Sequence, residues 1–186
     1  MKHLFDLIIS ILFVLLLLIP IVIIAFAVRI TSNGPIIYWS DRIGRNNVVF
    51  KMPKFRTMKY DTPPMASHLM KEPHKFLSPI GGFLRKYSLD EIPQLYSIIK
   101  GNMSLVGPRP ALFNQYDLIR LRTENNLDNL VPGLTGWAQI NGRDDLSIDL
   151  KVELDIEYMK KKSFSFDLKI LFLTIKMVTK RSGITH

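Results

Sequence analysis

The sequence predicts an α+β fold that is mostly helical. Residues 4–28 are almost wholly apolar, which indicates a membrane-embedded helix. Two short β-type runs, residues 36–39 and 48–50, flank the turn residues 44–47 and predict a small antiparallel β-hairpin. Further along the chain, apolar residues recur at helical spacing, which predicts amphipathic helices.

The apolar segment is interrupted only by Asp6, Ser10 and Pro20. It is longer than the ~7–15 apolar residues of a signal peptide, which favours a retained anchor over a cleaved leader. Pro20 either kinks a spanning helix or turns the chain back, because it removes one backbone hydrogen bond. Lys2 and Arg29 put positive charge at both ends, so the positive-inside rule does not choose between a spanning and a re-entrant helix.

Length and composition limit the rest of the chain. The 186 residues are enough for a membrane segment, residues 1–30, and one domain, residues 31–186. The net charge of +9 favours anionic partners: phosphorylated substrates, nucleic acid or an acidic membrane surface. There is no cysteine, which excludes disulfides and thiolate nucleophiles. The four histidines lack metal-ligand spacing, so no structural zinc site is expected.

Four helices are expected after the hairpin, at residues 88–99, 111–125, 147–162 and 166–179. Residues 60–79 are rich in proline and predict an irregular segment, and residues 131–143 predict a glycine-punctuated loop or short strand. The last helix has a large apolar face with Lys169 and Lys176 away from it. That pattern is typical of an interfacial helix, and equally of a helix that packs on a core.

The adjacent carboxylates Asp90 and Glu91 have two interpretations. Ser88 and Glu91 have the spacing of a helix capping box, and acids are favoured in a first helical turn. Basic residues precede them in the sequence: Lys51, Lys54, Arg56, Arg85 and Lys86. Two carboxylates among such cations suggest Mg²⁺-assisted phosphoryl chemistry. An aspartate can also attack phosphorus itself and form a covalent intermediate.

Arg109 lies between Pro108 and Pro110. Proline stiffens the backbone here, and a guanidinium suits bidentate recognition of phosphate. We therefore interpret Arg109 as a ligand clamp rather than a solvated charge. The sequence has no Walker A string, kinase catalytic loop or GxSxG elbow, so the common phosphate- and acyl-transfer enzymes are not candidates.

Four strings together resemble motifs of the bacterial sugar transferase family. They are KFRTM at residues 54–58, LDEIPQL at 89–95, GNMSLVGPRP at 101–110 and PGLTGWAQINGR at 132–143. The chain is most similar to the small monotopic phosphoglycosyl transferases of that family, and the resemblance covers nearly all of it.

The resemblance implies transfer of a sugar-1-phosphate from a UDP-sugar donor to polyprenyl phosphate, usually undecaprenyl phosphate, with release of UMP. This is the first membrane step of glycan assembly. Asp90 would be the nucleophile that forms a phosphosugar-enzyme intermediate. Glu91 would assist the lipid phosphate as a base, and the cofactor Mg²⁺ would bind at the pair with Asp90 as its ligand. The implied substrate-binding residues are Lys54, Arg56, Arg85, Arg109, Gln139 and Arg143.

The resemblance also implies a re-entrant membrane helix with its break at Pro20 and both ends cytoplasmic. The catalytic domain, residues 31–186, would then sit among membrane lipids on the cytoplasmic face of the bacterial inner membrane. Asn102 stands where relatives often have aspartate, so no metal role is expected there. Two competing hypotheses are a pyrophosphatase that uses water as acceptor and a membrane-tethered basic module. Nucleic acid is not an expected partner, and the motifs specify neither the sugar nor the oligomeric state.

Overall fold

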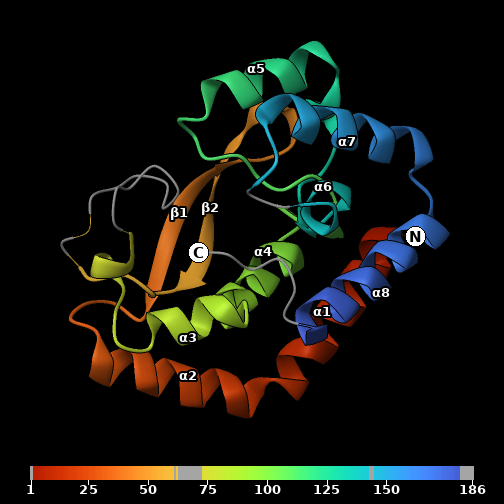
Figure 1. Ribbon diagram of the computed structural model, residues 1–186. Coiled ribbons are helices and arrows are strands. Elements are labelled where there is room, and N and C mark those ends of the chain that lie inside the picture. Colours follow the sequence, from red (N-terminus) through yellow and green to blue (C-terminus); the bar gives the residue numbers. More distant parts are fainter. Residues whose placement is uncertain (1, 61, 63–72, 143–144, 181–186) are drawn as a thin grey trace.

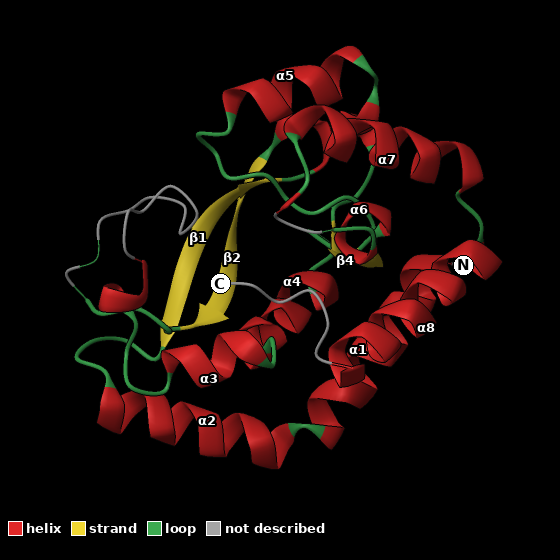
Figure 2. Cartoon of the chain, in the orientation of Figure 1, coloured by secondary structure: helices red, strands yellow, loops and turns green. Residues whose placement is uncertain are grey.

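An N-terminal pair of helices, two small sheets and a series of shorter helices make up the fold (Figures 1 and 2). The computed structural model describes residues 2–60, 62, 73–142 and 145–180. The α-helices are α1 (Lys2–Leu16), α2 (Leu18–Thr31), α3 (Gly81–Lys86), α4 (Leu95–Ile99), α5 (Tyr116–Glu124), α6 (Trp137–Ile140), α7 (Ile148–Lys161) and α8 (Phe164–Lys180). The strands are β1 (Ile37–Ile43), β2 (Val49–Phe55), β3 (Ser104–Val106) and β4 (Gly133–Thr135). The 3₁₀ segments are η1 (Arg45–Asn47), η3 (Pro73–Phe76), η4 (Leu89–Gln94) and η5 (Leu127–Asn129). The mostly helical α+β class is confirmed.

Strands β1 and β2 form the predicted antiparallel hairpin, with Ile37 opposite Phe55 and Ile43 opposite Val49. The turn contains Asn46 at a φ of 55°, in the left-handed region that asparagine tolerates better than most residues. Both strands are longer than the two β-type runs of the sequence, because cross-strand pairing extends each run by several residues.

A second sheet was not predicted in this form. Strands β3 and β4 pair in parallel, with Ser104 opposite Gly133 and Val106 opposite Thr135. Residues 131–143 were expected to form a loop or a short strand, and they supply β4 and then α6. Strands of three residues are too short to show an alternating pattern, so the pairing of distant segments could not be inferred.

The N-terminal helix breaks at Leu17, between α1 and α2, and the two halves are bent by 64°. The expected break at Pro20 is therefore wrong by three residues. Pro20 lies in the first turn of α2, where its missing N–H needs no partner. Its ring opposes the carbonyl of Leu16, the last residue of α1, which explains why the helix breaks before the proline.

Over the described part of the chain, no single helix is long and apolar enough to cross a membrane. The bent pair α1 and α2, taken together, has the length and composition for a broken span or a re-entrant loop. Both helices also pack on the rest of the chain: Ile24 and Val28 of α2 belong to a core cluster with Phe55 and Leu84. The division into residues 1–30 and 31–186 stays a prediction.

Helix α1 is attached to the domain by polar side chains. Asp6 is buried, and its Oδ2 accepts a hydrogen bond from Ser104 Oγ at 2.7 Å. Lys2 Nζ donates to the Val106 carbonyl at 2.9 Å and forms an ion pair with Asp167 of α8. Asp6, which interrupts the apolar segment, and Lys2, which precedes it, therefore face the protein. Helix α8 lies beside α1 (Figure 1).

The opposite faces of these helices are exposed and apolar. In α1 and α2 the exposed large side chains are Leu4, Ile8, Ile11, Leu12, Phe13, Leu15, Leu16, Leu18, Ile19, Val22, Ile23, Phe26 and Ile30. In α8, Ile170 is buried, whereas Leu168, Phe172 and Ile175 are exposed. Helix α8 thus has both a side that packs on the core and an exposed apolar side.

Two of the other expected helices change in extent. Residues 111–125 were predicted to be helical throughout, but α5 begins only at Tyr116. The chain before it pairs with β1. Ile43 N donates to the Ala111 carbonyl at 2.9 Å, and the backbones of Arg42 and Leu112 form an isolated antiparallel β-bridge. The expected helix 88–99 is the 3₁₀ segment η4 followed by the short helix α4. Helix α7 is confirmed, with the Ser147 side chain as its cap.

We expect Ser104→Ala to destabilise the protein by about 1–3 kcal/mol, because the buried Asp6 carboxylate loses a hydrogen-bond donor. A loss of 1 kcal/mol lowers Tm by about 2–4 °C in a chain of this size. Thermal unfolding in detergent, followed by tryptophan fluorescence, measures the change. Ser165→Ala, at an exposed position, is the matched control, and an equal Tm for the two variants would contradict this role of Ser104.

Candidate active site

Three segments bring charged side chains together around the adjacent carboxylates. Strand β2 supplies Lys54, η4 supplies Asp90 and Glu91, and the loop after β3 supplies Arg109. Segment η4 packs against β2, and the apolar residues of η4 continue the core cluster under the strand. Residues that are 37 positions apart in sequence (Lys54 and Glu91) and 18 positions apart (Glu91 and Arg109) therefore meet at one place, as expected for Lys54, Arg109 and the carboxylates.

Glu91 lies between two cations. Its Oε1 accepts hydrogen bonds from Lys54 Nζ at 2.8 Å and from Arg109 Nη2 at 2.9 Å, and its side chain is only 13% exposed. Burial by itself would raise the pKa of Glu91, but Arg109 and Lys54 outweigh it and hold that pKa well below the ordinary range. Glu91 is therefore firmly ionised and is a weak base in this arrangement.

Asp90 has a different environment from its neighbour. Its Oδ2 is 3.9 Å from Lys54 Nζ, and its side chain is 9% exposed. Burial raises the pKa of Asp90 and the charge of Glu91 adds to the rise, against the opposing effects of Lys54, Arg85 and Arg109. The ionised Asp90 carboxylate is thus less well stabilised than that of Glu91. A carboxylate in this condition is the more reactive of the two.

The capping-box interpretation of Ser88 and Glu91 is wrong. Ser88 has a φ of 54° and its side chain makes no capping hydrogen bond, while the Glu91 side chain bonds the two cations instead. The Glu91 carboxylate thus pairs with two full positive charges instead of with a backbone N–H. The helix start expected under Asp90 is a six-residue 3₁₀ segment that contains Pro93.

Arg85 and Arg56, both predicted substrate contacts, differ in position. Arg85 Nε donates to Thr57 Oγ1 at 2.9 Å, burial lowers the pKa of Arg85, and its charge acts on Asp90. Arg56 Nε donates to the Pro35 carbonyl at 2.8 Å, and its guanidinium lies near the rings of two exposed tyrosines. The structure therefore brings Arg85 to the carboxylates and gives Arg56 partners in the turn before β1.

Gln139 of α6 is buried, with 4% exposure, and within the described residues neither atom of its amide has a hydrogen-bond partner. The start of α6 packs tightly on the backbone two residues before Arg109, since a Cβ on Gly136 would lie 2.1 Å from the Gly107 carbonyl oxygen and 2.5 Å from Gln139 Oε1. Arg143, the remaining predicted contact, lies outside the described residues.

Arg42 was not among the site residues predicted from the sequence. Its charge acts on Lys54, and its Nη1 donates to the Pro110 carbonyl at 3.1 Å. The hairpin register could have revealed it: residues directly opposite each other point to the same face of a sheet, and Tyr38 is opposite Lys54 while Arg42 is opposite Phe50. Alternation along β1 then puts Arg42 on the face of Lys54.

The residues present fit a magnesium ion that is shared with a substrate, rather than one held by protein alone. Among the residues that the structure describes, no group of three or more histidine, aspartate or glutamate side chains could hold a metal. Mg²⁺ usually needs only one or two carboxylates, with phosphate oxygens and waters completing its coordination. Since Lys54 and Arg109 share one oxygen of Glu91, Asp90 is the better placed ligand.

Arginine and lysine side chains around a buried carboxylate pair have the chemistry to bind the oxygens of a phosphate group. Comparison with known proteins identifies the family. The bacterial sugar transferase family model matches residues 1–181, and the chain belongs to that family. The chain is 39% identical to the uncharacterised sugar transferase EpsL of Bacillus subtilis, over 99% of this chain and 90% of the relative.

Two further relatives have names that state a reaction. The undecaprenyl-phosphate glucose phosphotransferase of Komagataeibacter xylinus is 38% identical over 94% of this chain, and the UDP-glucose:undecaprenyl-phosphate glucose-1-phosphate transferase of Escherichia coli is 36% identical over 94%. The chain spans only 35% and 39% of the length of these two proteins.

Asp90→Asn and Glu91→Gln are expected to move Tm in opposite directions at pH 7. The lowered pKa of Glu91 means that its ionised form stabilises the fold above about pH 4.5, and that this contribution is lost as pH falls through the folded-state pKa. The raised pKa of Asp90 means that its ionisation costs stability as pH rises above about 3.8. Asp90→Asn should therefore raise Tm and Glu91→Gln lower it.

Each change of about 1 kcal/mol corresponds to about 2–4 °C in Tm, and both differences from the wild type should shrink as pH is lowered toward 4. Thermal unfolding of the three proteins between pH 4 and 7 checks the signs. A Tm that falls in both variants at pH 7 would show that the two carboxylates share one environment.

Proposed function

We propose that this protein transfers a sugar-1-phosphate from a UDP-sugar to polyprenyl phosphate, with undecaprenyl phosphate as the expected acceptor, and releases UMP. The observation that supports this most is the unequal pair: a buried Asp90 with a raised pKa beside a Glu91 that is fixed between two cations. The names of two relatives, which state undecaprenyl phosphate as acceptor and, in one of them, UDP-glucose as donor, support the same reaction.

In the proposed first step, an oxygen of the Asp90 carboxylate attacks the phosphorus that carries the sugar. The bond from this phosphorus to the bridging oxygen breaks, UMP leaves with that oxygen, and the phosphosugar stays on Asp90. In the second step, an oxygen of polyprenyl phosphate attacks the same phosphorus. The carboxylate leaves unchanged, and the product is a lipid-linked diphosphate sugar. Splitting the transfer in this way lets one buried site serve a soluble donor and a lipid acceptor in turn.

Lys54 and Arg109 are the proposed phosphate ligands, since both already bind an anionic oxygen at Glu91. When they turn to a substrate phosphate, Glu91 loses the cations that lower its pKa. Glu91 would then become basic enough to assist the lipid phosphate, which it is not while it is paired. In this scheme, the movement of Lys54 and Arg109 from Glu91 to the substrate phosphate couples substrate binding to the activation of Glu91.

Mg²⁺, when bound beside Asp90, would neutralise charge on the phosphates of the donor. Arg85 stabilises negative charge at Asp90, and Gln139 offers a buried amide to the ligand. Arg56 and Arg143 stay predicted contacts with the substrate.

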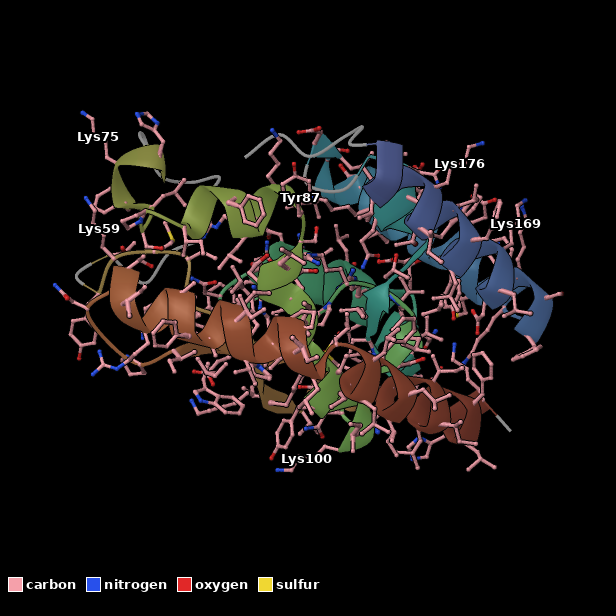
Figure 3. All side chains as sticks on the ribbon, turned by 90° about the horizontal axis from the view of Figure 1, so that it is seen from below. Lys59, Lys75, Tyr87, Lys100, Lys169 and Lys176 are labelled. Carbon is pink, nitrogen blue, oxygen red and sulfur yellow. The ribbon has the colours of Figure 1, made fainter. Side chains whose placement is uncertain are left out.

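We further propose that α1 and α2 form a re-entrant membrane element with both ends cytoplasmic, which seats the site on the cytoplasmic face of the bacterial inner membrane. The exposed apolar faces of α1, α2 and α8 support this. Seen from below, the labelled lysines lie around the edge of the face that α1 and α2 cross (Figure 3): Lys59 and Lys75 at one end, Lys169 and Lys176 at the other, and Lys100 at the side. Lysines at the rim of an apolar surface suit a membrane interface.

Asp90→Asn should abolish UMP release and also the trapping of radiolabelled sugar phosphate on the protein, because the nucleophile is removed. The assay combines a panel of UDP-sugars with Mg²⁺ and polyprenyl phosphate, and its products are separated into UMP, lipid-linked sugar and free sugar phosphate. Arg120→Gln, an exposed change on α5, is the control and should keep wild-type activity. Labelling that persists in Asp90→Asn would exclude Asp90 as nucleophile. Free sugar phosphate without any lipid product would instead indicate a pyrophosphatase.

A cysteine placed before Lys2 should be labelled only from the cytoplasmic side, because a re-entrant helix returns the chain to the side from which it entered. The chain has no native cysteine, so the label reports that position alone. Membrane-impermeant maleimide on intact cells and on inverted vesicles makes the measurement, and a second cysteine variant at the exposed Lys100 marks the cytoplasmic side. Labelling of the N-terminus in intact cells would establish a spanning helix.

A further inference from the structure

The backbone that carries Arg109 is held from two sides. The carbonyl oxygens of residues 109, 110 and 111 accept hydrogen bonds from Arg122 Nη1 at 2.8 Å, Arg42 Nη1 at 3.1 Å and Ile43 N at 2.9 Å, in that order. Three successive carbonyls outside any helix or named strand are therefore satisfied by donors of α5 and β1. Such a segment has little freedom to move relative to either element.

Arg122 in turn is fixed by Asp155 of α7. Its Nε and Nη2 both donate to Asp155 Oδ2, at 3.0 Å and 2.7 Å. The Asp155 side chain is 1% exposed and that of Arg122 is 13% exposed. Because all three guanidinium nitrogens are used, the plane of the group is set, and its remaining nitrogen is aimed at the Arg109 carbonyl.

A buried ion pair is weak evidence for stability, because removing two charges from water offsets most of their attraction. A well-packed apolar pair could join α5 to α7 equally well. It could not also donate to the Arg109 carbonyl. The feature that distinguishes Arg122 from an apolar substitute is therefore its contact with the segment that carries an active-site arginine.

We propose that Arg122 and Asp155 are positioning residues of the active site: they fix the peptide plane after Arg109 and so aim its guanidinium at Glu91 and at the substrate phosphate. This role rests on the proposed function. Pro110 already restricts Arg109 to extended backbone conformations. Arg122 then holds the Arg109 carbonyl, which lies one bond from the Cα that carries the side chain.

The link from Asp155 to the chemistry is short. Asp155 holds Arg122, Arg122 holds the backbone of Arg109, and Arg109 Nη2 donates to Glu91 Oε1 at 2.9 Å. Misplacement of a phosphate ligand by about 1 Å is enough to reduce a rate by about 100-fold. A change at Asp155 is therefore expected to reach the reaction without a contact to the substrate.

The double variant Arg122→Met/Asp155→Leu tests this role. It removes both charges together, so no buried charge is left alone, and its Tm should stay near that of the wild type. Its kcat/KM for UDP-sugar, measured from UMP release, should fall by about 10-fold or more. Arg122→Lys, which keeps the charge opposite Asp155 but lacks the planar fork, should show a similar fall with the fold intact. Arg120→Gln on the same helix is the matched control and should show neither change.

A second comparison separates positioning from general loosening of the fold. In an Arg109→Ala background, the double variant should have no further effect on kcat/KM, since the side chain that it positions is absent. Effects that multiply in that background would overturn the proposal, as would wild-type kcat/KM in both Arg122→Lys and the double variant. If the wild type releases UMP but either of these two contradicting results appears, only the positioning role fails. A wild type that releases no UMP overturns the proposed function and this role with it.

Discussion

The hydrogen bonds from Lys54 and Arg109 to one oxygen of Glu91 connect the three segments that make the site. They join strand β2, segment η4 and the loop after β3, and they replace the helix cap that the same glutamate could have made. Because Glu91 is buried, its two cations are needed to keep it ionised. The same two cations are the groups that a substrate phosphate would attract, so binding and the ionisation of Glu91 depend on each other.

Asp90, the neighbour of Glu91, has less compensation for its charge. The cations that serve Glu91 leave its neighbour less well compensated, and burial raises the pKa of Asp90. Two adjacent carboxylates therefore differ in reactivity although they differ by only one position in the chain. Within this pair, the cost in stability falls on the residue that the proposed reaction uses, in keeping with the tendency of perturbed carboxylates to occur at functional sites.

The proposed membrane element and the site share one core. Ile24 and Val28 of α2 pack with Phe55, which follows Lys54 in sequence, and Leu89, which precedes Asp90, packs against the same cluster. The helix proposed to enter the membrane thus shares one core cluster with the strand and the segment that carry the charged groups.

The sequence was sufficient where one local feature decides the outcome, as in the hairpin and helix α7. The family resemblance grouped Lys54 and Arg109 with Asp90 and Glu91. It was insufficient where distant segments compete for the same group. Ser88 and Glu91 have capping-box spacing, and only the approach of Lys54 and Arg109 in the folded chain reveals that the glutamate is used otherwise. The parallel pairing of β3 with β4 and the contact of Arg122 with the Arg109 carbonyl depend on tertiary packing in the same way.

The most direct measurement is isotope exchange in the absence of a lipid acceptor. A covalent intermediate on Asp90 forms before polyprenyl phosphate binds, so radiolabelled UMP should enter the UDP-sugar pool with enzyme, Mg²⁺ and UDP-sugar alone. Exchange that appears only when polyprenyl phosphate is added, or that never appears in an enzyme able to form the lipid product, would show that the sugar phosphate passes directly from donor to acceptor and would contradict the role assigned to Asp90.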